Sequence, residues 1–116
     1  MSLIRAGDVV TIDFPGVEGV KRRPAIVVSS AIYHQHRADV IVGVVTSQIE
    51  KATAPTDYAM KDWVGAGLHR PSAFRTFLAT LPATAATAIG HCSERDWLGI
   101  VACLEKAIAG LHEASL

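Results

Sequence analysis

Short runs of β-branched residues dominate the first half of the chain. Residues 8–14 alternate between apolar and polar side chains, which is the period of a half-buried β-strand. Residues 25–30 form a short run that begins with Ala-Ile-Val-Val, and residues 40–46 are almost continuously apolar; both patterns predict strands that are covered on both faces. We expect the later of these two strands at the centre of the sheet. A loop is predicted at 15–19, and the basic run Lys21-Arg22-Arg23-Pro24 leads from it into the second strand.

The end of the chain predicts an amphipathic helix. Ser93 can cap the first turn, and the acidic side chains of Glu94 and Asp96 suit the positive end of the helix dipole. Apolar residues then recur at three- and four-residue steps: Trp97, Ile100, Val101, Leu104, Ile108 and Leu111. We interpret this stripe as the face that packs on the core.

The middle of the chain adds further short elements. Residues 73–78 alternate and predict another strand, and residues 56–60 are compatible with a short one. The Ala/Thr segment 82–88 fits either a helical turn or a loop. With 116 residues and a mass of 12.3 kDa, the whole chain, 1–116, is expected to form one domain. The predicted fold class is a β-rich α+β fold, in which five or more strands curl into a small barrel with a C-terminal helix packed on it.

Composition narrows the class of protein. Hydrophobic residues make up 50% of the chain and charged residues 19%, which is too apolar for a disordered protein. The longest aliphatic run, Val40 to Val45, is far shorter than the ~20 residues that span a bilayer, so we expect a cytoplasmic protein that does not enter the membrane. Cys92 and Cys103 do not have the spacing of a zinc site and are expected to be small buried thiols, and no metal or cofactor is implied.

Charge is distributed unevenly, although 11 basic side chains balance 11 acidic ones. Residues 1–37 hold five Lys/Arg against three acids, whereas residues 91–116 hold two against four. An anion site is therefore expected in the N-terminal half. The chain has neither a glycine-rich phosphate loop nor a Ser or Cys nucleophile motif, so nothing supports an NTP-driven or acyl-transfer reaction.

Two residues stand out as candidates for binding an anion. Arg23 precedes Pro24 at a strand, where a planar guanidinium can bond two phosphate oxygens at once; alternatively, the basic triplet is only a solvated loop. Thr46 ends an aliphatic strand, and its hydroxyl can donate to a phosphate or simply bond its own backbone. Five histidines can supply acid–base catalysis or serve as surface and capping residues: His34, His36, His69, His91 and His112.

Several short motifs, in order and spacing, carry a family resemblance. They are Gly7-Asp8-Val9-Val10, Arg23-Pro24-Ala25-Ile26-Val27-Val28-Ser29, Val44-Val45-Thr46-Ser47-Gln48, Gly67-Leu68-His69-Arg70-Pro71-Ser72 and Ile89-Gly90. Together they span nearly the whole chain, which resembles the MazF/PemK family of toxin ribonucleases. The resemblance implies an SH3-like barrel with a C-terminal helix, usually assembled as a homodimer.

The same resemblance implies a function. Such proteins cleave single-stranded RNA at short sequence motifs without a metal, leaving 2′,3′-cyclic phosphate and 5′-OH ends, and a cognate antitoxin from the same operon inhibits them. Contact with operator DNA is expected only through the antitoxin. Arg23 and Thr46 fall at the family's catalytic positions, and Arg22, Ser47 and Gln48 are expected to bind RNA. The group that takes the 2′-OH proton is left open, with His34 or His36 as candidates.

The sequence departs from the family pattern at two places, which leaves alternatives to the nuclease function. The 15–22 loop is shorter than in many members, and Phe77-Leu78-Ala79-Thr80 replaces a run that is often polar, so recognition of bases is not defined. The alternative to a nuclease is a non-catalytic SH3-like binding module, or a gyrase poison that acts like CcdB through its terminal helix. The helical stripe from Trp97 to Leu111 is more simply interpreted as core packing, which ranks the poison below the nuclease.

Overall fold

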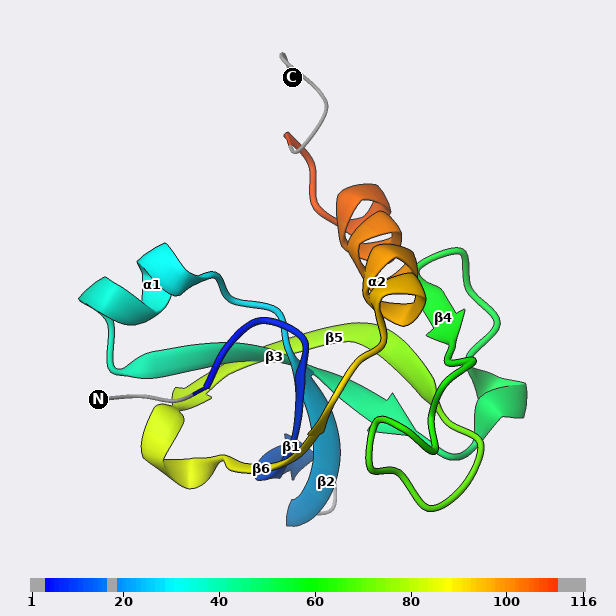
Figure 1. The fold of residues 1–116 in the computed structure, drawn as a ribbon, viewed down its shortest axis with the longest axis horizontal. Helices are drawn as coiled ribbons and strands as arrows, with labels where there is room; N and C mark the ends of the chain where they lie inside the picture. Colours follow the sequence, from blue (N-terminus) through cyan, green and yellow to red (C-terminus); the bar gives the residue numbers. More distant parts are fainter. Residues whose placement is uncertain (1–3, 17–18, 111–116) are drawn as a thin grey trace.

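A computed structural model of the chain describes residues 4–16 and 19–110, which form one antiparallel sheet and two helices (Figure 1). The strand order in the sheet is β4-β5-β3-β2-β1-β6. The strands are β1 (Asp8–Gly16), β2 (Gly19–Val27), β3 (Asp39–Thr46), β4 (Asp57–Ala59), β5 (Ala73–Pro82) and β6 (Thr87–His91). The helices are α1 (Ala31–His36) and α2 (Glu94–Ala107).

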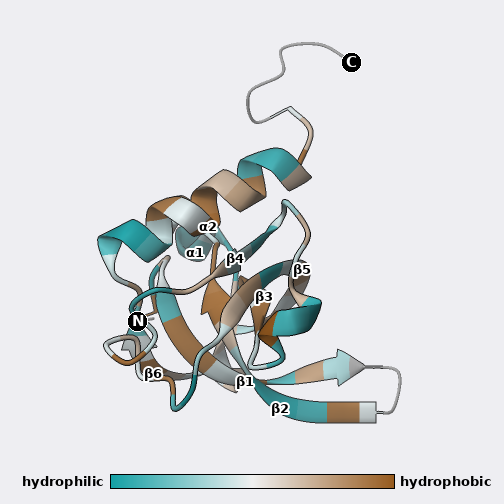
Figure 2. Ribbon diagram, turned by 90° about the vertical axis from the view of Figure 1, so that its right-hand side faces the viewer, coloured by the Kyte–Doolittle hydropathy of each residue, from teal (hydrophilic) through white to brown (hydrophobic). Residues whose placement is uncertain are grey.

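The predicted β-rich α+β fold with a C-terminal helix is confirmed. The sheet curls like a barrel but stays open, because β4 and β6 lie at its two ends. Both helices lie above the sheet in Figure 1, and Figure 2 shows the β1–β2 hairpin extending away from the body of the sheet. One apolar core contains Val9, Phe74 and Ile100, and a second contains Val10, Ile12 and Val42. Successive residues of β1 therefore face two different cores, as its alternation requires.

The central strand agrees closely with the sequence. β3 lies between β5 and β2 and spans Asp39–Thr46, so the apolar segment 40–46 is central, as predicted. The strands expected at 8–14, 56–60 and 73–78 are present as β1, β4 and β5.

The second strand differs from its prediction. It was expected at 25–30 with Pro24 at its start, but β2 runs from Gly19 to Val27, and Pro24 lies inside it opposite Thr11 of β1. Pairing along the β1–β2 hairpin extends β2 backwards, so Arg22 and Arg23 belong to a strand rather than to a loop. Pairing with β3 begins only at Ala25, after the proline.

Two elements were not predicted. The polar stretch after β2 contains α1, which Ser30 caps by accepting a hydrogen bond from the backbone N–H of Tyr33. The other is β6: the Ala/Thr segment 82–88, expected to be a helical turn or a loop, has a short 3-10 turn at Ala83–Ala85, but it also contains the end of β5 and the beginning of β6. β6 is a sheet edge with mostly exposed side chains, so it lacks the alternation that identifies a half-buried strand.

The terminal helix begins as predicted. The Ser93 side chain accepts a hydrogen bond from the Asp96 N–H at 3.2 Å, and Ile100 is fully buried. Trp97 and Leu104 are partly buried against the same core, but α2 ends at Ala107 and Ile108 is 41% exposed, so the packing stripe is shorter than predicted. Leu111, the last residue of that stripe, lies outside the described residues.

Both cysteines are buried free thiols, as expected from their spacing. Burial raises the pKa of Cys92 to about 12 and also raises that of Cys103, so both thiols stay protonated near neutral pH. Within residues 4–16 and 19–110, neither helix has the length and apolar character needed to cross a bilayer.

Candidate functional site

A cavity of about 540 Å³ opens where β1, β2 and β3 meet β6 and the loop between β4 and β5. That loop, residues 60–72, is called the 60–72 loop below, and its base is closed by a 2.9 Å hydrogen bond from the Met60 N–H to the Ser72 carbonyl. The described residues that line the cavity are Thr11, Arg22, Arg23, Pro24, Val45, Thr46, Ser47, Gln48, Gly67, Leu68, His69, Arg70, Ser72 and Ile89. They come from distant parts of the sequence, so the cavity exists only in the folded chain.

The structure brings together all five residues that the sequence singled out for the site. Arg22 and Arg23 come from β2, Thr46 ends β3, and Ser47 and Gln48 follow it. They share one cavity because β2 and β3 are hydrogen-bonded neighbours in the sheet.

The Thr46 hydroxyl has a defined partner. Its Oγ1 accepts a hydrogen bond from the Gln48 backbone N–H at 3.1 Å. This is the backbone contact that the sequence offered as an alternative to anion binding. The two roles are compatible, because a hydroxyl that accepts a hydrogen bond still has its own proton to donate. The contact also fixes where the Thr46 oxygen lies.

Arg23 presents its charge to the cavity. Its backbone pairs with Ile12 in the β1–β2 ladder, which fixes the start of the side chain. The side chain is exposed, and within the described part of the chain no hydrogen bond or ion pair engages its guanidinium. The five N–H donors of that group are available to an anionic ligand.

Arg22 is bound differently from its neighbour. Its guanidinium donates to the Thr11 carbonyl at 3.2 Å and to the Thr87 hydroxyl at 3.1 Å, and it lies 3.4 Å from an Asp13 carboxylate oxygen. These contacts join β2 to β1 and β6 at the rim of the cavity. Arg22, expected to bind RNA, therefore also braces three strands around the cavity.

The sequence prediction missed the contribution of the 60–72 loop to the site. His69 and Arg70 line the cavity and are exposed, although neither was predicted as a site residue: His69 was one of five candidate histidines, and Arg70 was noted only within a family motif. The two histidines favoured from the sequence are elsewhere: His34 and His36 lie on α1, and His34 Nε2 is 2.6 Å from the Ser29 hydroxyl. The sequence signal that could have identified His69 was its position within the motif Gly67-Leu68-His69-Arg70-Pro71-Ser72.

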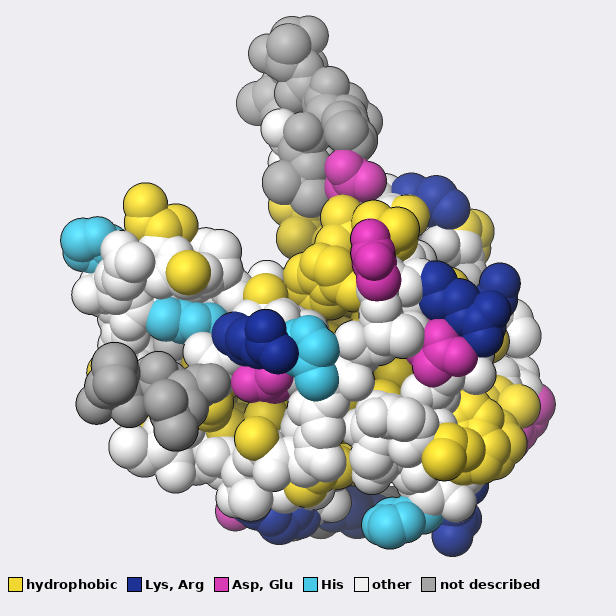
Figure 3. All heavy atoms as spheres, viewed as in Figure 1, with side chains coloured by type: hydrophobic (Ala, Val, Ile, Leu, Met, Phe, Trp, Pro, Cys, Tyr) yellow, Lys and Arg dark blue, Asp and Glu magenta, His cyan; other side chains and the backbone are white. Residues whose placement is uncertain are grey.

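The lining is cationic. It contains three arginines and one histidine, and none of the described residues in it carries a carboxylate. Hydroxyl and amide groups accompany the charges, and Pro24, Val45, Leu68 and Ile89 add apolar surface. In Figure 3, dark blue Lys and Arg side chains gather along the lower edge of the molecule, beneath β1 and β2. Such a surface can bind a phosphate and pack against the face of an unpaired base.

Two glycines allow the 60–72 loop to lie directly against β6. A Cβ on Gly67 would overlap the carbonyl oxygen of Ile89, and a Cβ on Gly90 would overlap the carbonyl oxygen of Ala66. Gly67 also has a φ of 86°, which favours glycine. The backbone of the loop therefore contacts the backbone of β6 beside the cavity.

Replacing Gly90 by alanine is expected to push the 60–72 loop away from β6. Overpacking of this kind costs about 1–3 kcal/mol of folding free energy, and it should also weaken ligand binding, because the displaced loop carries His69 and Arg70. Urea denaturation and a binding titration with an oligonucleotide measure the two effects. Gly65→Ala is the matched control, since a Cβ there would be 3.8 Å from the nearest atom outside its immediate neighbours. If the two variants had the same urea midpoint and the same affinity for the oligonucleotide, the contact between the 60–72 loop and β6 would not have this role.

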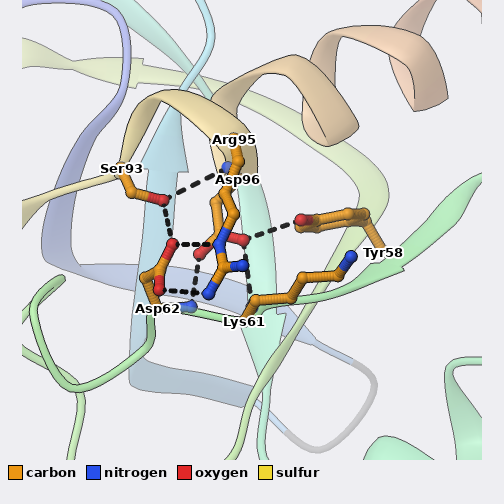
Figure 4. Close-up of polar contacts among 6 residues, drawn as sticks. All are labelled: Tyr58, Lys61, Asp62, Ser93, Arg95 and Asp96. Carbon is orange, nitrogen blue, oxygen red and sulfur yellow. Dashed lines mark hydrogen bonds and ion pairs between the residues drawn. The ribbon is translucent and has the colours of Figure 1, made fainter.

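A buried carboxylate joins the beginning of the 60–72 loop to α2 (Figure 4). Asp96 is fully buried and accepts three hydrogen bonds, from the Tyr58 hydroxyl at 2.7 Å and from the backbone N–H groups of Lys61 at 2.9 Å and Asp62 at 2.8 Å. Burial, followed by the hydrogen bond to Asp96, raises the pKa of Tyr58 well above its usual value, so its hydroxyl stays a donor. Asp96 thus holds one end of the loop.

Asp62 forms a second link between the same two elements. Arg95 donates to both of its oxygens at 2.7 Å, and the Ser93 hydroxyl donates to one of them at 2.6 Å. These hydrogen bonds, from Arg95 first and Ser93 second, lower the pKa of Asp62 to about 2. Arg95 therefore binds the Asp62 carboxylate through two hydrogen bonds at once, the geometry in which a guanidinium binds a carboxylate most strongly.

Acid should remove the contribution of the Asp62–Arg95 ion pair to the stability of the fold. Because the pKa of Asp62 is lowered by folding from 3.8 to about 2, its stabilising effect is complete above about pH 4 and is lost as the pH falls towards about 2. Urea midpoints of the parent protein should therefore exceed those of Arg95→Ala by a constant amount near neutral pH, and the difference should shrink between about pH 4 and about pH 2. A difference that stays constant throughout would contradict the pairing.

The sequence matches a model of a protein family. The model described as "PemK-like, MazF-like toxin of type II toxin-antitoxin system" aligns with residues 5–108. A search of curated proteins gave no significant match. The matched range includes all the elements that line the cavity, together with α2.

Solved structures share the fold at low sequence identity. An endoribonuclease in complex with its cognate antitoxin, from a mycobacterial species, has a TM-score of 0.73 and 22% identity, with 90% of this chain and 93% of that chain covered. The MazE–MazF complex of Deinococcus radiodurans (Form II) has a TM-score of 0.70 and 19% identity, with 94% and 98% covered. The Mycobacterium tuberculosis toxin MazF-mt6 has a TM-score of 0.70 and 19% identity, with 86% and 94% covered.

Proposed function

Because the chain belongs to the family of PemK-like, MazF-like toxins of type II toxin–antitoxin systems, we propose that it is a sequence-specific endoribonuclease. Its proposed substrate is single-stranded RNA, and its proposed products carry 2′,3′-cyclic phosphate and 5′-OH ends. The reaction is proposed to need no metal. The donor set of the cavity supports this, since its described lining offers one imidazole and no carboxylate or thiol to a cation.

One observation carries the proposal: a single cavity combines a guanidinium that no described residue engages with a fixed hydroxyl. Arg23 and Thr46 both line it, and both are held by strands of one sheet. In the proposed reaction, the ribose 2′-OH attacks the adjacent phosphate and negative charge develops on the phosphate oxygens. Donors fixed in advance stabilise that charge, because they need no reorganisation as the reaction proceeds.

The remaining lining residues suit an RNA strand. Ser47, Gln48 and Arg70 provide polar and cationic contacts, and the apolar side chains of Leu68 and Ile89 provide a surface for a base. Affinity for RNA depends strongly on phosphate neutralisation, so it is supplied here by local rather than net charge.

The proposed partners follow from the family. A cognate antitoxin should inhibit the protein, since one similar structure is an endoribonuclease in complex with its cognate antitoxin and another is a MazE–MazF complex. We further propose a homodimer in the cytoplasm, with operator DNA contacted only through the antitoxin. Large apolar side chains remain exposed on β2, β5 and α2, among them Val20, Phe77 and Leu98, and they offer apolar surface for protein contacts.

The test is incubation of the purified protein with a long mixed-sequence RNA in EDTA, followed by mapping of the fragment ends. We expect cuts at a short recurring sequence with 5′-OH and 2′,3′-cyclic phosphate ends. A matched RNA with a single 2′-deoxynucleotide at the cut site should stay intact, because the attacking hydroxyl is missing. Intact RNA in every sample would favour the non-catalytic binding module instead.

A further inference from the structure

The proposed cleavage needs a group that takes the proton from the attacking 2′-OH. Most polar side chains in the cavity are unsuited to this task. Arg22, Arg23 and Arg70 contribute guanidinium groups, which have hydrogen-bond donors but no acceptor, and the hydroxyl and amide groups are very weak bases. Among the described residues of the lining, His69 alone carries an imidazole, the side chain that most often serves as a general base.

We propose that His69 is the general base of this site, an inference that rests on the proposed ribonuclease function. The imidazole takes the 2′-OH proton as the O2′–P bond forms. The P–O5′ bond then breaks, and the leaving O5′ takes a proton from water, while the imidazolium returns its proton to the solvent. The step leaves a 2′,3′-cyclic phosphate and a 5′-OH, so atoms and charges balance without any co-reactant other than water.

The loop holds His69 on both sides in the sequence. Before it, the Leu68 N–H donates to the Trp63 carbonyl at 3.1 Å, and Gly67 lies against the backbone of β6. After it, the Ser72 hydroxyl donates to the Arg70 carbonyl at 2.8 Å. A base must reach the reacting hydroxyl with little freedom of position, and this anchoring restricts the backbone of His69.

The imidazole of His69 is also unengaged. It is exposed, and within residues 4–16 and 19–110 nothing hydrogen-bonds to it. His34 and His91 differ, because His34 Nε2 contacts the Ser29 hydroxyl and His91 Nδ1 lies 2.8 Å from an Asp8 oxygen. The charged groups that share the cavity with His69 are the three guanidiniums and, when RNA is bound, the phosphate they hold.

The test compares the parent protein with His69→Gln and His36→Gln in a metal-free RNA cleavage assay across a range of pH. The parent's kcat/KM should rise on the acidic side with a limiting logarithmic slope of about one. His69→Gln should lower kcat about a hundredfold, leave KM nearly unchanged and lose that acidic limb. His36 is exposed on α1 and does not line the cavity, so its variant should match the parent. Added imidazole should restore part of the activity to His69→Ala, an effect that a merely structural residue would not show.

The outcomes separate the two proposals. If the parent protein cleaves RNA and His69→Gln keeps most of the activity with an unchanged pH profile, His69 is not the base, although the nuclease function stands. If His69→Gln raises KM but leaves kcat and the acidic limb intact, His69 only binds the substrate, and the inference is wrong. If the parent protein cleaves no RNA at all, the proposed function itself fails and the assignment of His69 fails with it.

Discussion

Replacing Arg23 by alanine is expected to lower the rate of RNA cleavage about a hundred- to a thousandfold, the usual cost of removing one donor from a site that stabilises an oxyanion. The guanidinium lines the cavity from a strand of the sheet and is unengaged by the described residues, so its removal should leave the fold intact. Single-turnover rates on a short RNA that contains the mapped cut site measure the effect. The loss should appear mainly in the rate of the chemical step.

Two further variants control this experiment. Arg23→Lys keeps the charge but loses the planar fork, so it should recover only part of the activity. Arg37→Ala removes an arginine that is also largely exposed, at 63%, but lies outside the cavity lining, with its guanidinium 3.6 Å from Asp39. Its activity should equal that of the parent. Full activity in Arg23→Ala would exclude the proposed mechanism.

Replacing Asp96 by alanine should destabilise the protein by about 3–5 kcal/mol. The substitution leaves two buried backbone N–H groups and the Tyr58 hydroxyl without their acceptor, and each unsatisfied donor costs about 1–3 kcal/mol. Small domains have a total stability of only about 5–15 kcal/mol, so the variant should lose a large part of its stability. Urea denaturation followed by circular dichroism measures the change.

Glu94→Ala is the matched control for Asp96→Ala. Glu94 is another acidic residue in the first turn of α2, but it is exposed, so its removal should cost only the few tenths of a kcal/mol of a dipole interaction. Comparable losses in the two variants would show that Asp96 acts through the helix dipole rather than through the donors it binds.

The sequence predicted those elements whose pattern of apolar and polar side chains matches their burial or their capping in the structure. The apolar run 40–46 became the central strand β3, and Ser93 caps α2 as its position indicated. β6 could not be found this way, because it is held by backbone pairing to β1 and exposes most of its side chains. The early start of β2 had the same cause, since pairing within the β1–β2 hairpin extends it through a basic segment.

The site was predictable only in part, for a similar reason. The basic run before Pro24 and the polar end of β3 suggested Arg23 and Thr46, and family resemblance assigned them roles that await the experiments above. His69 could not be chosen over four other histidines, because only the tertiary structure brings it to the cavity. Asp96 was interpreted as a first-turn acid, and its three donors come from residues 34 to 38 positions earlier in the sequence.

Asp96 lies far behind the 60–72 loop in the sequence, so it is also synthesised after the loop that it holds. A ribosome releases the chain from its N-terminus, so every residue that lines the cavity, from Thr11 to Ile89, emerges before the carboxylate that fixes the 60–72 loop. A nascent chain therefore carries the cavity residues before it has the contact that secures their arrangement. The proposed site is therefore completed late, because its loop is secured only after α2 has been translated.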